Sequence, residues 1–153
     1  MVLHDEELTI WLSFLKTLPN TRANRRFKVI CDTLLASALR INELLALGIQ
    51  DLDFESCEII VNKTLVWKAG NRKLGVRGEI LCKNTPKTDA GNRRVPVPRE
   101  TLQNLKDFHN EMNLYFDKHE LPRTDLIFPT IYGNYMCDRN ERATLKKRLT
   151  ELG

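Results

Sequence analysis

The hydrophobic period of this chain changes twice along its length, and these changes constrain the fold more than any other feature. Apolar residues first recur at helical spacing, with Trp11 and Leu15 on one face of a helix predicted over residues 5–17. A run typical of a β-strand follows at residues 57–66, and helical spacing returns from Leu102 onward. The sequence therefore predicts an α+β fold, mainly α-helical with a small antiparallel three-stranded β-sheet.

The predicted helices have recognisable ends. Asn42 is the predicted N-cap and Gly48 the predicted stop of a short third helix. The spacing of Asp138 and Glu141 is typical of a capping box that opens the last helix. After the first helix, the predicted helices cover residues 24–37, Asn42 to Leu47, Leu102 to beyond Tyr115, and residues 138–152.

Turn-forming residues divide the middle of the chain into strands. A glycine-punctuated basic loop is predicted at residues 68–78. Two further strands are predicted to form a hairpin through a turn around residues 89–91, and Pro96 places the second of them at a sheet edge. These two strands are predicted at Glu79 to Asn84 and at Arg93 to Val97.

Positive charge is concentrated in one block of the chain. The 153 residues carry a net charge of +4, but residues 61–100 hold ten Lys or Arg against three Asp or Glu. Such a block suits a polyanion, because each phosphate contact releases counterions. The alternative is a solvated, Lys-rich hairpin edge that discourages aggregation. Charge alone leaves both interpretations open.

Composition is that of a soluble intracellular domain. The length fits one domain with a substantial core, and 42% of the residues are hydrophobic against 29% charged. The sequence has no run of 18 apolar residues, and its acidic N-terminus is unlike a secretory signal. Four widely spaced cysteines argue against a zinc site or a disulfide framework, and they are Cys31, Cys57, Cys82 and Cys137. We expect a cytoplasmic protein without membrane association.

Arg40 and Glu43 form the first candidate site, at the junction of two predicted helices. An Arg among apolar neighbours needs a partner, and Glu43 lies three residues further on. Taken alone, this spacing favours a structural ion pair. The functional interpretation is a guanidinium held by Glu43 and directed at a phosphate, because a guanidinium forms bidentate hydrogen bonds with phosphate oxygens and stays charged.

Lys87 is the second candidate, in the predicted hairpin. The ordinary interpretation is an exposed turn lysine. The functional one is a flexible ammonium that neutralises charge and donates a proton to a leaving alkoxide. Lys63 and Lys83 are rivals for this role, but neither is followed by the turn and the R-R-V-P strand.

Two segments together resemble the catalytic domain of the tyrosine recombinases, the phage integrase family. They are A-L-R-I-N-E-L-L-A-L at residues 38–47, followed by D-L-D-F, and P-K-T-D-A-G-N-R-R-V-P-V-P at residues 86–98. The resemblance covers nearly the whole chain, and Ala38 departs from it where many members carry Gly. It implies site-specific DNA recombination and integration, in which a Tyr hydroxyl attacks a phosphodiester and forms a 3′-phosphotyrosine.

The resemblance also implies roles and partners. Arg40 clamps the phosphate, Glu43 supports it, and Lys87 protonates the departing 5′-oxygen. Neither metal nor nucleotide cofactor is implied, because the covalent link conserves the bond energy for rejoining. The implied partner is double-stranded DNA carrying attachment sites, bound by a tetramer of the full-length protein at the nucleoid. The residues expected to contact DNA are Lys68, Arg72, Lys73, Arg77, Lys83, Arg93 and Arg94.

Two parts of the family pattern have no match in this sequence. The later His-x-x-Arg-His motif and the Tyr nucleophile are missing, and Gly153 falls about where they should begin. The separate N-terminal core-binding domain is missing too. We therefore expect residues 1–153 to be a partial catalytic domain, inactive alone and without a nucleophile. The tyrosines, in other contexts, are Tyr115, Tyr132 and Tyr135.

Two alternatives remain open at this point. The first is a non-catalytic DNA-binding module of helix-turn-helix type, with Asn42 to Leu47 as the recognition helix. Against it, that helix presents leucines, which are core residues and not base readers. The second is a protein-interaction domain whose basic loop binds some other acidic partner.

Overall fold

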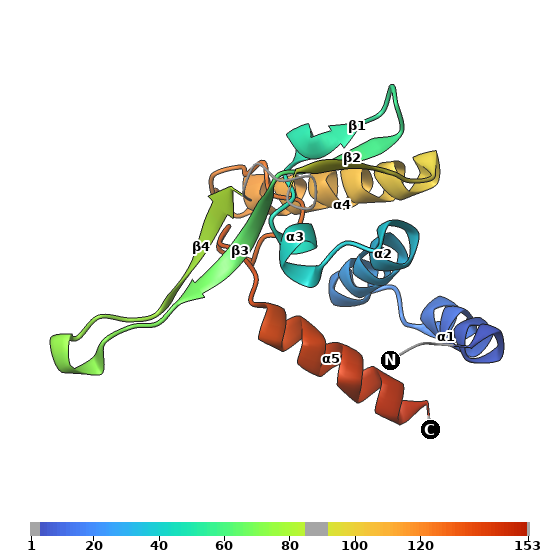
Figure 1. The fold of residues 1–153 in the computed structure, drawn as a ribbon, viewed down its shortest axis with the longest axis horizontal. Helices are drawn as coiled ribbons and strands as arrows, with labels where there is room; N and C mark the ends of the chain where they lie inside the picture. Colours follow the sequence, from blue (N-terminus) through green and yellow to red (C-terminus); the bar gives the residue numbers. More distant parts are fainter. Residues whose placement is uncertain (1–3, 85–91, 153) are drawn as a thin grey trace.

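The computed structural model describes residues 4–84 and 92–152, which form a helical body with a small sheet and a long β-hairpin (Figure 1). The described part is mainly α-helical and contains a three-stranded antiparallel sheet, which confirms the predicted fold class. Its α-helices are α1 (Asp5–Thr17), α2 (Arg22–Ser37), α3 (Ile41–Leu45), α4 (Arg99–Lys118) and α5 (Asp138–Glu151). Its strands are β1 (Leu52–Asp53), β2 (Glu58–Val61), β3 (Lys63–Lys68), β4 (Glu79–Asn84) and β5 (Arg93–Pro96). Two 3₁₀ turns are η1 (Ile49–Asp51) and η2 (Arg72–Leu74).

The strands form two sheets where the sequence predicts one. The three-stranded sheet has the order β1-β2-β5, and β3 pairs with β4 in a separate antiparallel hairpin. The predicted single strand over residues 57–66 is therefore wrong, because exposed Asn62 divides it between β2 and β3. Its inward alternation runs on through Ile59, Val61 and Leu65, so the hydrophobic period does not reveal that the strand changes partners.

The predicted pairing of Glu79 to Asn84 with Arg93 to Val97 is also wrong. β4 pairs with β3, and β5 pairs with β2. The turn around residues 89–91 that was expected to join them lies outside the described residues. β5 does lie at an edge of its sheet, as Pro96 predicts, because a proline has no N–H to donate to a further strand.

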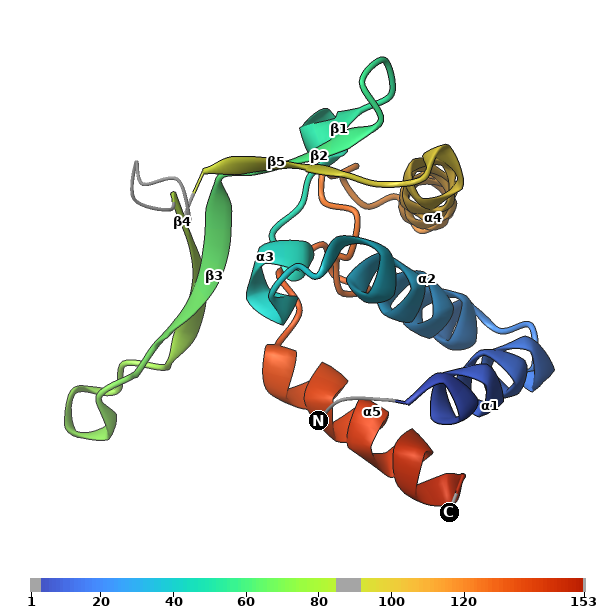
Figure 2. The same ribbon diagram turned by 45° about the vertical axis from the view of Figure 1, so that its right-hand side comes forward.

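Two hydrophobic clusters hold the body together. The larger one joins α3 and α4 to the sheet, with Leu44, Leu45 and Leu105 fully buried. The smaller one lies among α1, α2 and α5, around Trp11 and Phe27 (Figure 2). Burial of apolar surface at these two places fixes α2 between the sheet side of the molecule and α5.

The helix ends correct three expectations. The N-cap of α3 is Arg40 and not Asn42, since the Arg40 backbone N–H bonds to the side chain three residues on. Gly48 precedes η1 instead of ending α3. The expected capping box of α5 does not form, because its N-cap is Cys137 and Glu141 is buried beside a residue of α2. These helix ends are therefore determined by the contacts of Arg40 and Glu141, and not by the local spacing of capping residues.

The hairpin of β3 and β4 projects away from the body, with η2 at its tip (Figure 1). Trp67 lies on it and is 55% exposed. A Cβ atom on Gly78 would lie 2.3 Å from the Trp67 ring, so only glycine allows the two to pack without movement. The predicted basic loop at residues 68–78 is therefore the end of an ordered hairpin.

Candidate functional site

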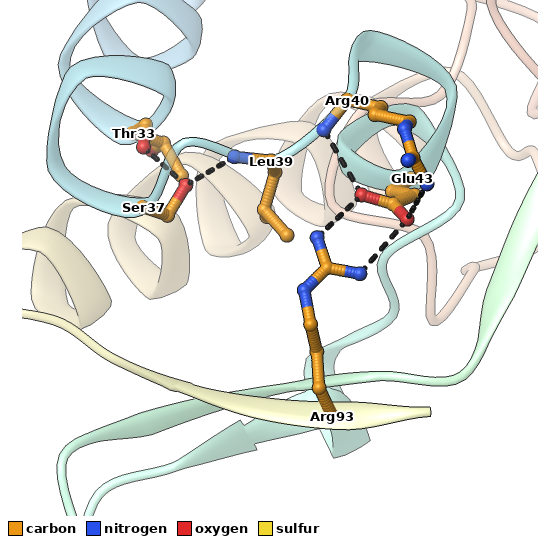
Figure 3. A network of polar contacts seen from close by, with 6 residues as sticks. All are labelled: Thr33, Ser37, Leu39, Arg40, Glu43 and Arg93. Atoms are coloured by element: carbon orange, nitrogen blue, oxygen red, sulfur yellow. Dashed lines mark hydrogen bonds and ion pairs between the residues drawn. The ribbon is translucent and has the colours of Figure 1, made fainter. Parts of the chain in front are cut away.

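The turn between α2 and α3 presents Arg40. α2 ends because Ala38 adopts a left-handed conformation, with φ 52° and ψ 28°. The Ser37 hydroxyl accepts the Leu39 backbone N–H at 3.3 Å and donates to the Thr33 carbonyl at 2.5 Å (Figure 3). These contacts satisfy backbone groups that the end of the helix leaves open, and they fix the direction in which the chain enters α3.

Glu43 is the buried centre of this turn, with 2% of its surface exposed. Its Oε2 accepts the Arg40 backbone N–H at 2.9 Å. Arg93, on β5, donates to both carboxylate oxygens, at 3.0 Å to Oε1 and 2.9 Å to Oε2 (Figure 3). The hydrogen bonds from Arg93 hold the pKa of Glu43 below its ordinary value, so the carboxylate is charged at neutral pH.

Arg40 itself is exposed. Its side chain is 77% exposed, and its Nη1 lies 3.5 Å from Oε1 of Glu43, at the outer limit of a hydrogen bond. It borders a pocket of about 550 Å³ that is otherwise mainly apolar and lies among α2, α3 and α5. The expected Arg40–Glu43 pair is present, but the main cationic partner of Glu43 is Arg93.

A sequence comparison finds a relative that matches most of the length of this chain. A tyrosine recombinase XerC-like protein of Caldanaerobacter subterraneus subsp. tengcongensis is 28% identical over 152 residues, which is 91% of this chain and 37% of the relative. No family model matches the chain.

Solved structures show the same arrangement of elements. The Tn1549 transposon integrase, solved in complex with transposon right end DNA, superposes with a TM-score of 0.67 at 24% identity. The match covers 99% of this chain and 44% of the integrase chain. The XerH site-specific recombinase, solved bound to its difH substrate, gives a TM-score of 0.65 at 18% identity over 99% of this chain and 36% of XerH.

The chain has the fold of a tyrosine recombinase catalytic domain. It spans less than half the length of the recombinases it matches. The helix-turn-helix alternative fails on this fold, because α3 has five residues and Leu44, Leu45 and Leu47 are at most 1% exposed. Only Ile41 and Asn42 of this helix are partly exposed, which is too little surface for a recognition helix in a DNA groove.

Of the three lysine candidates for the proton donor, the structure describes two. Lys87 lies outside the described residues. Lys63 forms a half-buried ion pair with Asp51, whose Oδ2 also accepts the Gly48 backbone N–H at 2.8 Å. This ion pair favours a structural role for Lys63, and its role as a rival proton donor stays a prediction. Lys83 is exposed on β4.

The basic residues of the hairpin share one projecting element of the recombinase fold (Figure 2). Lys68 lies 3.9 Å from Glu79 across the two strands, a weak surface contact. Four basic residues on this hairpin are exposed, namely Lys68, Arg72, Lys73 and Arg77. Their exposure leaves them accessible to a phosphate backbone.

Arg93 and Arg94 point to different partners. Arg93 holds Glu43, and Arg94 pairs with Asp53 and, at 3.5 Å, with Glu58. The Arg93–Glu43 pair could not be predicted from local spacing, since fifty residues separate its members. Contact of either arginine with DNA stays a prediction.

Among the helices of the part of the chain that the structure describes, none is long and apolar enough to cross a membrane.

The three tyrosines of the described residues lie in different surroundings. Tyr115 of α4 packs edge-on against Phe116 and against His119, which directly follows this helix, at ring separations of 5.7 and 4.2 Å. Tyr132 is 77% exposed, and burial raises the pKa of the Tyr135 hydroxyl.

Proposed function

We propose that this chain is part of the catalytic domain of a tyrosine recombinase that cuts and rejoins DNA at specific attachment sites. The observation that carries the proposal is the Arg40 turn. A buried carboxylate anchors the backbone of Arg40 while leaving its side chain 77% exposed. The similarity to DNA recombinases over most of the chain supports the same function.

Arg40 is the proposed phosphate clamp of this reaction. Its planar guanidinium bonds two non-bridging oxygens of the scissile phosphate and stabilises the charge that develops as the nucleophile attacks. Glu43 supports it by fixing the backbone from which the side chain extends. Removal of a donor of this kind raises a reaction barrier by several kcal/mol, about 3 kcal/mol in measured cases.

Lys87 is the proposed general acid. The ammonium protonates the 5′-oxygen as it leaves, while a tyrosine hydroxyl attacks the phosphorus and forms the 3′-phosphotyrosine link. Rejoining reverses both steps, and the covalent link supplies the free energy. The sequence contains no His-x-x-Arg-His segment and none of its tyrosines has that context. We therefore propose that residues 1–153 do not cleave DNA by themselves and that the whole recombinase supplies the core-binding domain, the second Arg and the nucleophile.

Double-stranded DNA is the proposed partner, and a tetramer at the nucleoid is the proposed working assembly. The exposed cations that would follow its backbone are Lys68, Arg72, Lys73, Arg77 and Lys83. Arg94 has acidic partners and would have to exchange them for a phosphate.

A nicked attachment-site substrate tests the proposal. The whole recombinase should form a covalent protein–DNA adduct on a denaturing gel, and Arg40→Ala should abolish it. The 153-residue chain should form none. An adduct formed by this chain through Tyr115, Tyr132 or Tyr135 would overturn the proposed division of the site.

A further inference from the structure

The Arg40 turn contains two guanidinium groups and one buried carboxylate. Within the described residues, Glu43 is paired with Arg93 and with Arg40. The two contacts are unequal, since Arg93 is 28% exposed and bidentate, whereas Arg40 is 77% exposed and reaches one oxygen at 3.5 Å. One positive charge neutralises Glu43, and the other is left at the surface.

The position of Arg93 is set by the sheet and not by the turn. Its Cα is paired with that of Val61 in the antiparallel register of β2 and β5, and Val61 is buried in the core. The side chain crosses from this strand to α3 (Figure 3). Glu43 is therefore held from a rigid element that lies fifty residues away in sequence.

We propose that Arg93 is a positioning residue for Arg40: it neutralises Glu43 and thereby leaves the Arg40 guanidinium free to bind phosphate. This inference rests on the proposed function of Arg40. It replaces the expected contact of Arg93 with DNA.

The physical reason is competition for a buried charge. A carboxylate that is 2% exposed requires a cationic or hydrogen-bonding partner. Without Arg93, the nearest described cation is Arg40, and its Nη1 already lies 3.5 Å from Oε1. A small side-chain rotation would close this gap into a normal ion pair and turn the guanidinium away from a phosphate.

Chemical modification of arginine by phenylglyoxal tests this on the 153-residue chain. The reagent attacks accessible guanidinium groups, and mass spectrometry gives the rate at each residue. The rate at Arg40 is measured relative to the exposed Arg72 on the hairpin tip. We expect Arg93→Gln to slow the reaction of Arg40 by about threefold, the effect of a partly exposed ion pair.

A second-site change distinguishes positioning from mere loss of structure. In the double variant Arg93→Gln with Glu43→Gln, a neutral amide still accepts the Arg40 backbone N–H but no longer attracts its guanidinium. The rate at Arg40 should return to that of the parent. Arg94→Gln is the matched control, since Arg94 is the next residue and pairs with Asp53 instead, and it should leave Arg40 unchanged.

Two results would overturn the proposal. One is a folded Arg93→Gln chain whose Arg40 reacts at the parent rate, and the other is a double variant that stays as slow as the single one. Thermal unfolding followed by circular dichroism checks the fold. Arg93→Lys keeps the charge with a one-point contact and should give an intermediate rate. If neither Arg93→Gln nor Arg93→Lys folds, Arg93 serves the fold and the proposal fails.

The same modification experiment, repeated with DNA present, tests the proposed function separately. A short DNA duplex should protect Arg40 of the parent chain from phenylglyoxal. Absence of protection would count against the phosphate role of Arg40, while the effect of Arg93 on Arg40 is read from the variants without DNA. The two failures are therefore distinguishable.

Discussion

Arg93 holds the buried carboxylate of Glu43 through two hydrogen bonds, 3.0 Å to Oε1 and 2.9 Å to Oε2. This bidentate pair connects an edge strand of the sheet to the turn that presents Arg40. Bidentate guanidinium–carboxylate pairs restrict orientation as well as distance. The geometry of the Arg40 turn therefore depends on the sheet as much as on the two helices that flank it.

Removal of Arg40 and removal of Glu43 should affect stability unequally. Arg40→Ala should cost less than about 1 kcal/mol of unfolding free energy, because its ion pair is exposed. Glu43→Ala should cost about 2–4 kcal/mol, because it leaves Arg93 without this partner and opens space in a buried site. Both arginines lose this carboxylate, but the loss is greater at Arg93, whose side chain is 28% exposed, than at Arg40, whose side chain is 77% exposed. Urea unfolding of the two variants measures both values, and equal losses would contradict the assignment.

Glu43 and Glu141 should affect the pH dependence of the unfolding free energy in opposite directions. Arg93 holds the pKa of Glu43 below its ordinary 4.5, so its contribution is complete above that pH and is lost as pH falls through the lower folded value. Burial raises the pKa of Glu141, so protonation of that carboxyl favours the folded state as pH falls. Between about pH 6 and pH 3, Glu43→Gln should make the loss of stability shallower and Glu141→Gln should make it steeper. Unfolding free energies across this range decide the signs, and a steeper loss in Glu43→Gln would be inconsistent with the ion pair.

Ala38→Gly should stabilise the chain by about 0.5–1 kcal/mol. A left-handed residue other than glycine costs about 1–2 kcal/mol, and the greater freedom of glycine in the unfolded chain offsets part of the gain. Ala143→Gly, at an exposed position inside α5, is the control and should destabilise by about 1 kcal/mol. Melting curves of the two variants should therefore shift in opposite directions. A downward shift for both would mean that Ala38 is not strained.

Binding of DNA by this chain should be weak, poorly sequence-specific and salt-dependent, with the hairpin responsible for much of the dependence. Alanine at all four exposed hairpin cations should reduce the slope of log affinity against log salt by up to about 3.6, if each contacts one phosphate. The residues replaced are Lys68, Arg72, Lys73 and Arg77. A matched variant removes four exposed lysines outside the hairpin, and these are Lys16, Lys118, Lys146 and Lys147. An equal change of slope in both variants would show that charge alone, and not the hairpin, contacts DNA.

Lys87→Ala in the whole recombinase should slow cleavage by about 10²–10⁴-fold, the usual contribution of a general acid. DNA affinity should change little, since one contact among many is lost. A substrate with sulfur in place of the bridging 5′-oxygen loses a thiolate that needs no proton, so its cleavage should be nearly as fast in the variant as in the parent. Persistent slow cleavage of the sulfur substrate would assign Lys87 to binding, and rescue in Lys83→Ala instead would move the acid to Lys83.

The sequence by itself determined the elements and the local motifs. The apolar period predicted α1, α2 and α4, because a helix that buries one face must repeat its apolar residues every three to four positions. The A-L-R-I-N-E segment likewise marked Arg40 and Glu43 as neighbours, since residues three apart at a helix start lie within reach of each other.

Only the tertiary structure decided which distant parts meet. The run from residue 57 to residue 66 keeps one alternation while changing sheets, and nothing in a period of two specifies the partner strand. Glu141 was expected to cap its own helix, but packing placed it beside Arg26 of α2. Arg93 pairs with Glu43, fifty residues away in sequence, because a buried carboxylate binds the cation that the folded chain brings to it.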